Sequence, residues 1–131
     1  MDKAVISDTS CLIALERIGK LEVLKLLFAK VLITEEVRIE FGQAIPDWIV
    51  VVKNQNTSKF FELHKVLDSG EASSIAFAFG VENSILIIDE VKGRKVAAEN
   101  GLEIIGTLGL LLLAKKRGLA EDLEQVLMDL N

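Results

Sequence analysis

Four acidic residues are the part of this sequence best suited to do chemistry: Asp8, Glu40, Glu71 and Asp89. Asp8 directly follows the apolar run at residues 4–7, and Asp89 directly follows the run at residues 85–88. Because the carboxyl ends of parallel strands share one edge of a sheet, acids in these positions can meet there. Carboxylates gathered without cations favour a hard divalent metal ion, and such an ion suits chemistry on phosphate groups.

Glu40 belongs to a helix that the sequence predicts to begin after Thr34. Glu35 and Glu36 would then occupy the first turn, where acids are favoured. Val37 and Phe41 mark the apolar face, and helical spacing puts Glu40 near the border of that face. Glu40 is therefore either a solvated surface acid or a side chain that reaches the metal site.

Glu71 lies in the segment Asp68-Ser69-Gly70-Glu71, which has the spacing of a capping box with Asp68 as the N-cap. Glu71 is also spaced i, i+4, i+8 with Ile75 and Phe79, so it shares the face that turns to the core. A cap and a site residue are compatible at this position.

Asp8 and Asp89 also have a structural interpretation, since an Asp just before a helix commonly accepts bonds from free backbone N–H groups. Of the adjacent acids Asp89 and Glu90, Asp89 is the better candidate ligand because it directly follows the strand, whereas Glu90 is expected in the first turn of the next helix. The structural interpretation explains each acid alone. Crowded carboxylates at one edge would repel one another unless a cation neutralised them.

Five short β-branched runs predict the strands that position these acids, at residues 4–7, 31–33, 49–52, 85–88 and 104–105. Apolar patterns with helical spacing separate them, and strands that alternate with helices indicate an α/β fold with a parallel sheet. Residues 119–131 form a last amphipathic pattern, which predicts a helix that docks on the body or on a second subunit.

Bulk properties favour one domain spanning residues 1–131, with an aliphatic core: 50% of residues are hydrophobic and 5% aromatic. The net charge of -5 argues against a general nucleic-acid coat but not against a nuclease with a bound metal ion. Cys11 is the only cysteine and reads as a small buried apolar residue. No signal peptide is visible, and the most apolar stretch, residues 108–114, is too short to span a bilayer, so a cytoplasmic protein is expected.

Seven stretches in this order resemble the PIN-domain ribonucleases, in particular the branch related to VapC-type toxins: ISDTS (6–10), LIAL (12–15), TEEVRIE (34–40), LDSGEA (67–72), IIDE (87–90), GRKVA (93–97) and IGTLG (105–109). The resemblance implies a three-layer α/β/α fold with a central parallel sheet of about five strands. It also implies Mg²⁺- or Mn²⁺-dependent cleavage of single-stranded RNA, as the toxin of a toxin–antitoxin pair, and a homodimer.

The resemblance also assigns roles to the four acids. Asp8 matches the family's first metal-binding Asp, Glu40 its helix-borne Glu, and Asp89 the acid after the fourth strand. Glu71 falls where many members carry a third Asp, and its extra methylene leaves open whether it reaches the metal directly or through water. We expect Asp8 and Asp89 to coordinate directly, with Glu40 and Glu71 holding metal-bound waters or a second ion.

Four further residues would serve the substrate in such an enzyme. Ser10 and Thr107 could orient water or phosphate through their hydroxyl groups, although both could instead cap helices. Lys92 and Arg94 could contact RNA phosphate, although both could instead lie on a solvated helix face.

Two other functions remain open on the sequence. A catalytically weak PIN-like module could act by binding a partner, such as an antitoxin that covers the acidic site with an arginine. A receiver-type phosphoacceptor domain would have two adjacent acids after the first strand and an Asp after the third, whereas here Thr9-Ser10 follow Asp8 and Lys53-Asn54 follow Val52. The D-x-D pattern of haloacid dehalogenases also fails, because position 10 is Ser.

Overall fold

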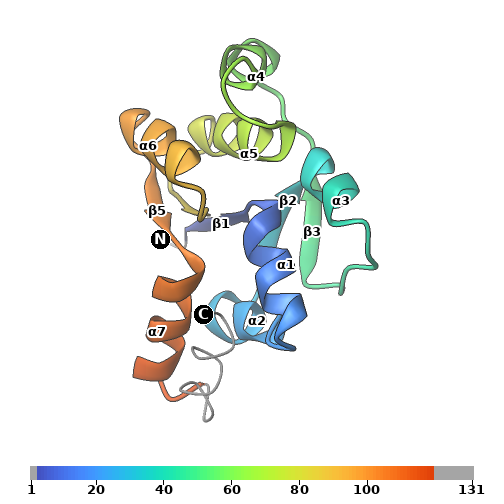
Figure 1. The fold of residues 1–131 in the computed structure, drawn as a ribbon, viewed down its shortest axis with the longest axis vertical. Helices are drawn as coiled ribbons and strands as arrows, with labels where there is room; N and C mark the ends of the chain where they lie inside the picture. The colour runs from blue at the N-terminus through green and yellow to red at the C-terminus, as the bar shows by residue number, and fades with distance from the viewer. Residues whose placement is uncertain (1–2, 120–131) are drawn as a thin grey trace.

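The computed structural model of the chain describes residues 3–119, and strands alternate with helices along them (Figure 1). The strands are β1 (Ala4–Ser7), β2 (Val31–Thr34), β3 (Ile49–Val52), β4 (Ser84–Ile87) and β5 (Glu103–Ile105). The helices are α1 (Thr9–Arg17), α2 (Glu22–Phe28), α3 (Glu35–Phe41), α4 (Thr57–His64), α5 (Ser69–Phe79), α6 (Val91–Glu99) and α7 (Thr107–Lys116). The five predicted strands are confirmed, each to within one residue at either end.

The five strands form one parallel sheet in the order β3-β2-β1-β4-β5. The first three strands build outward from β1 on one side, and the chain then returns to add β4 and β5 on the other. The direction of building therefore reverses between β1 and β4. In open parallel sheets this reversal opens a crevice at the carboxyl ends of the two strands, where ligands bind.

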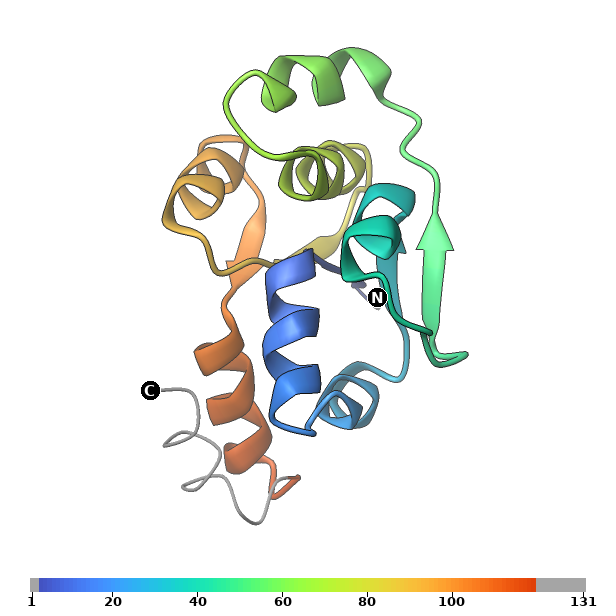
Figure 2. The ribbon, with the colours of Figure 1, turned by 45° about the vertical axis from the view of Figure 1, so that its right-hand side comes forward.

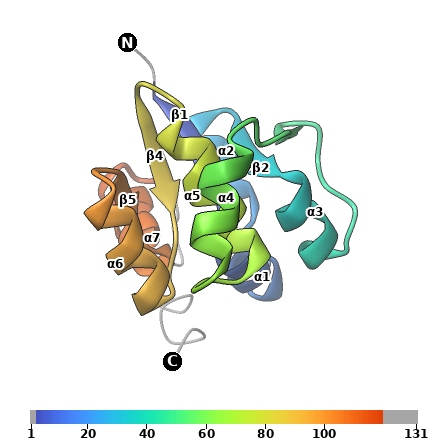
Figure 3. The same cartoon turned by 90° about the horizontal axis from the view of Figure 1, so that it is seen from above.

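Successive strand residues face opposite sides of the sheet and enter two separate cores. Val5 and Ile87 pack with α1, α2, α3 and α7, whereas Ile6 and Leu86 pack with α4, α5 and α6. The three-layer α/β/α arrangement is thus confirmed. Figure 2 shows α4 on the outer side of α5, and Figure 3, seen from above, shows α4 over α5 with α6 to one side.

The predicted helix starts are confirmed by hydrogen bonds to side chains. Asp8 caps α1 by accepting from the Cys11 N–H at 3.2 Å, Thr34 caps α3, and Asp68 caps α5 by accepting from the Glu71 N–H at 2.8 Å. The first-turn position expected for Glu90 is wrong by one residue. Glu90 is itself the N-cap of α6, and its Oε2 accepts from the Gly93 N–H at 2.9 Å.

The stretch from residue 3 to residue 119 contains no helix both long and apolar enough to cross a lipid bilayer. The amphipathic helix predicted for residues 119–131 lies outside the described residues, apart from Leu119, which packs against the core on the α7 side.

Candidate active site

Asp8 and Asp89 lie at the point where the direction of sheet building reverses. Ser7 pairs in register with Ile87, and the Asp8 N–H donates to the Ile87 carbonyl at 3.0 Å, so the two chains leave the sheet side by side. Helices α3 and α5 bring Glu40 and Glu71 from other parts of the chain. Because β1 and β4 are neighbours, the acids that follow them lie at the same carboxyl edge of the sheet.

Asp8 is almost wholly buried, with 1% of its surface exposed. Its Oδ1 accepts from the Cys11 N–H, whereas its Oδ2 is buried without a hydrogen-bond partner. The pKa of Asp8 is raised to about 7, chiefly by burial and also by the charges of Asp89, Asp68 and Glu40, while the bond from the Cys11 N–H acts in the opposite direction. A buried carboxylate that has a partnerless oxygen and lies near other acids favours either a proton or a cation.

Glu71 shows the same features on the first turn of α5. Only 8% of its surface is exposed, and its Oε2 is also buried without a partner. Burial raises the pKa of Glu71, and so do the neighbouring charges of Asp68, Glu90 and Asp8. Within residues 3–119, these oxygens of Asp8 and Glu71 are the two buried side-chain N or O atoms that lack a partner.

Glu40 is exposed on α3, yet both of its carboxylate oxygens accept hydrogen bonds. Thr9 Oγ1 on α1 donates to Oε1 at 2.6 Å, and the Gly70 N–H at the start of α5 donates to Oε2 at 3.3 Å. The expectation that Glu40 lies at the border of the buried face is consistent with this position. Glu40 thus links α1, α3 and α5, and its negative charge helps to raise the pKa of Asp8.

Gly70 and Gly93 have no side chain, and the carboxylates of Glu40 and Glu71 occupy the space that a Cβ atom would need. A Cβ atom on Gly70 would stand 2.1 Å from Glu40 Oε1 and 3.0 Å from Thr9 Oγ1. A Cβ atom on Gly93 would stand 2.6 Å from Glu71 Oε2. Real carbon–oxygen contacts are longer than this, so any larger residue would displace a site acid.

The Gly70→Ala variant is expected to displace the exposed Glu40 carboxylate from its bonds to Thr9 and the Gly70 N–H and to lower the free energy of unfolding by about 1 kcal/mol, the usual net value of a hydrogen bond. Urea unfolding measures this loss, and activity assays should show a parallel fall. Gly80→Ala is the matched control, because its Cβ would meet only the Phe77 carbonyl at 3.6 Å. Equal effects of the two substitutions would show that Glu40 is not held in this way.

Asp89 differs from Asp8 in having both oxygens occupied by Thr107. The Thr107 N–H donates to Oδ1 at 2.6 Å, and the Thr107 hydroxyl donates to Oδ2. Gly106, the residue before α7, provides no side-chain cap, so Asp89 supplies the cap of α7 from across the sheet edge. Thr107 therefore orients Asp89 here, and its predicted contact with water or phosphate stays a prediction.

The Thr107→Val variant is expected to lose a partly buried hydrogen bond to a charged group, which lowers the free energy of unfolding by about 1.5–3 kcal/mol. Thr107→Ser keeps the hydroxyl and should retain most of that stability. Thermal or urea unfolding of the two variants checks this. If Val instead left stability unchanged and lowered cleavage alone, the hydroxyl would act on the substrate rather than on Asp89.

The other predicted substrate residues flank the four acids. Arg94 is half-buried, and its Nη1 donates to the Ile88 carbonyl at 3.3 Å. A Cβ atom on Gly106 would lie within 2.6 Å of that nitrogen and 3.0 Å of Asp89 Oδ1, so the guanidinium and the carboxylate share one small space. Lys92 and Ser10 are exposed in the first turns of α6 and α1.

Asp68 is a further member of the acid cluster, although its sequence context predicts only a helix cap. Its charge raises the pKa of both Asp8 and Glu71, which places it among the site acids. The signal that could have found it is its spacing of three residues from Glu71, which puts both side chains at one end of α5. Thr9 was also missed as the hydroxyl that holds Glu40.

Cys11 lies beneath the site and is fully buried. Burial raises the pKa of its thiol to about 12, with a hydrogen bond to Thr107 acting in the opposite direction. The thiol therefore stays protonated and acts as the small buried residue that the sequence predicts.

The residues present fit a hard divalent cation in charge and donor type, because the acids offer only oxygen ligands and two of those oxygens lack partners. Across residues 3–119, no group of three acidic, His or Cys side chains stands close enough to hold one ion directly. Mg²⁺ commonly binds one or two carboxylates and keeps several waters. Asp8 and Glu71 suit that kind of binding, since their partnerless oxygens are free to accept.

A parallel α/β sandwich with carboxylates at its topological reversal is an arrangement that can hold a divalent metal ion at the carboxyl edge of the sheet. The family model described as DUF3368, a PIN domain, matches residues 4–131, and the chain belongs to this PIN-domain family. PIN domains are generally nucleases that use divalent metal ions. Comparison with curated proteins and with solved structures finds no match.

Proposed function

We propose that this PIN domain is a Mg²⁺- or Mn²⁺-dependent endoribonuclease that cleaves single-stranded RNA, and that it acts in the cytoplasm as the toxin of a toxin–antitoxin pair. The observation that supports it most is the pair of buried, partnerless oxygens on Asp8 and Glu71 at the carboxyl edge of the sheet. Burying two such groups costs folding free energy, and binding a cation there offsets that cost.

A bound divalent cation would lower the pKa of an attacking water and stabilise charge on the phosphate. Asp8 and Glu71, whose partnerless oxygens are free to accept, would hold it, with Asp89 and Glu40 alongside. The Cys11 N–H fixes the Asp8 carboxylate, and Thr107 fixes that of Asp89.

Substrate contacts would come from the rim of the site. Lys92 would meet RNA phosphate from the exposed first turn of α6, and Ser10 would donate from α1. Arg94 contributes positive charge beside Asp89 while it bonds to the Ile88 carbonyl. The chain's net charge of -5 gives RNA little long-range attraction, so affinity would depend on these local contacts and on the metal ion.

The direct test uses an end-labelled pool of single-stranded RNA with Mg²⁺, with Mn²⁺, or with EDTA, and the same sequences as duplexes. Cleavage of the single strands with either metal ion, and none with EDTA, is expected. The Lys92→Ala variant should weaken binding without abolishing cleavage at saturating RNA. Metal-dependent cleavage of duplexes alone, or no cleavage of any RNA, would contradict the proposal.

A binding module is the second candidate, and the occupied oxygens of Glu40 and Asp89 favour it. Each of these acids already accepts two hydrogen bonds from the chain, which leaves fewer ligands for a metal ion. An antitoxin arginine could then pair with Asp8 and Glu71, and the expected homodimer would present two such sites. A cognate basic peptide that binds equally well with EDTA, with no cleavage by the free protein, would favour this candidate.

The receiver alternative does not fit the structure. Receiver domains of the CheY type have the strand order 2-1-3-4-5, whereas this sheet runs β3-β2-β1-β4-β5. The PIN-domain match points the same way.

A further inference from the structure

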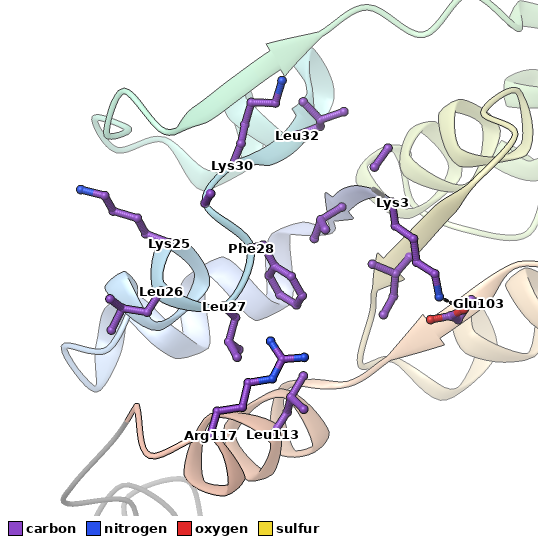
Figure 4. A pocket seen from close by; sticks show the side chains of 14 residues that line it. Lys3, Lys25, Leu26, Leu27, Phe28, Lys30, Leu32, Glu103, Leu113 and Arg117 are labelled. Carbon is purple, nitrogen blue, oxygen red and sulfur yellow. Dashed lines mark hydrogen bonds and ion pairs between the residues drawn. The ribbon is translucent and has the colours of Figure 1, made fainter. Parts of the chain in front are cut away.

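A basic groove lies at the edge of the sheet opposite the acids, where the strands begin. It encloses about 940 Å³ between α2, the first residues of β1 and the last turns of α7 (Figure 4). We call it the basic groove and define it by Lys25, Leu27, Phe28, Lys30, Leu113 and Arg117 among its lining residues.

The floor of the basic groove is an open part of the hydrophobic core. Leu27, Phe28 and Ile85 pack against the core on the α7 side, yet all three remain partly exposed. Leu26 beside them is 56% exposed on α2. Apolar side chains gathered in one concave surface indicate that something apolar covers them.

The walls of the groove are positive, although the chain as a whole is negative. Lys3, Lys25, Lys30 and Arg117 line it together with one acid, Glu103, which forms an ion pair with Lys3. In Figure 4 the Arg117 side chain extends toward Phe28, while Lys25 and Lys30 stand at the rim. An occupant of this groove should therefore be both apolar and acidic.

Residues 120–131 of this chain have that composition. Four acids and no Lys or Arg occur there: Glu121, Asp122, Glu124 and Asp129. The apolar residues Leu123, Val126, Leu127 and Leu130 are spaced i, i+3, i+4, i+7, which suits one face of a helix. The PIN-domain match continues to residue 131, so this segment belongs to the matched domain.

The chain enters this segment from the rim of the groove. Gly118 has φ +69°, its N–H donates to the Lys115 carbonyl at 3.0 Å, and the Leu119 N–H donates to the Ala114 carbonyl at 2.8 Å. These two bonds form a Schellman motif, which ends α7 and reverses the chain. Leu119 then packs against the core, two residues after the groove residue Arg117.

We propose that residues 120–131 dock in the basic groove of their own chain, with Leu123, Val126, Leu127 and Leu130 on the floor and the acids facing the groove cations. Twelve residues span roughly 18 Å as a helix. RNA is the weaker candidate, because the groove opens at the strand starts while the site acids lie at the strand ends. The inference does not depend on the proposed function.

Paramagnetic relaxation in the full chain tests this. A nitroxide is attached through Asn131→Cys, since Cys11 is fully buried and does not react. Amide signals of residues 3–5 and 25–30 should broaden, and those around Asp8 and Asp89 should not. A mixture of spin-labelled and ¹⁵N-labelled chains should show no broadening between molecules. Uniform broadening, or broadening only in the mixture, would overturn the proposal, the latter in favour of a second copy.

Charge reversal identifies the contacts. Lys25→Glu with Lys30→Glu should lower the ratio of docked to undocked segment about fivefold, as should Glu121→Lys with Glu124→Lys, and all four together should restore docking. The Glu121→Lys, Glu124→Lys variant changes only residues outside 3–119, so it remains informative if the Lys25→Glu, Lys30→Glu variant fails to fold. Lys65→Glu with Lys95→Glu, both exposed elsewhere, is the matched control. No restoration in the fourfold variant would overturn the pairing.

Discussion

The Asp8→Asn variant is expected to lose metal-dependent RNA cleavage by at least about 100-fold, since even residues that only support a metal ligand cost 10- to 100-fold when changed. Its fold should persist and its metal-free form should gain stability. The reason is that Asn keeps the shape and can still accept from the Cys11 N–H, but removes a charge buried among Asp68, Asp89 and Glu40.

Cleavage rates, Mn²⁺ binding by calorimetry and urea unfolding should be measured on the same preparation. Asp47→Asn is the matched control, because Asp47 is an exposed acid away from the site, in the segment between α3 and β3. An Asp8→Asn protein that binds Mn²⁺ and cleaves RNA as well as the unsubstituted chain would remove Asp8 from the site.

The second large effect is a fall in the stability of the metal-free protein as pH rises. The folded state holds the pKa of Asp8 at about 7, above its ordinary value of 3.8, so it binds the proton more tightly than the unfolded chain does. Stability from this group is therefore complete below pH 3.8 and is lost as pH rises through 7. Asp8 alone accounts for a loss of about 4 kcal/mol in the free energy of unfolding, and Glu71 acts in the same direction.

Urea unfolding between pH 4 and pH 8.5, with EDTA or with Mn²⁺, measures this dependence. Saturating Mn²⁺ should restore about 3 kcal/mol at pH 8 when its concentration is 100 times its dissociation constant, and should have little effect at pH 4. Asp8→Asn should flatten the pH profile and reduce the gain from Mn²⁺. A metal-free protein that grows more stable between pH 5 and pH 8 would contradict the assigned burial.

The strands and two of the site acids could be predicted because their signals are local. The run at residues 4–7 alone indicates a buried strand, and Asp8 follows it in sequence. Glu71 was assigned to the inward face from its spacing with Ile75, and it is 8% exposed. Each inference uses only the period of a strand or helix, which neighbouring residues carry.

Contacts between distant segments could not be predicted from such periods. Asp89 accepts from Thr107, eighteen positions later, because β4 and β5 are neighbours in the sheet. Glu40 meets Thr9 and Gly70 only after three helices have packed together. The prediction that Glu90 lies in the first turn is wrong by one residue. An Asp and a Glu in succession offer two possible caps, and only the path of the chain selects one.

Helix α7 has a consequence that reaches beyond its own packing. It begins at Thr107, which holds Asp89, and it ends at Lys116, directly before Arg117 on the basic groove. Ten residues of helix form a stiff rod about 15 Å long, so a shift along its axis moves both ends together. A ligand at one edge of the sheet that moved α7 along its axis would change the free energy of binding at the other edge, and by linkage the effect would be the same in both directions.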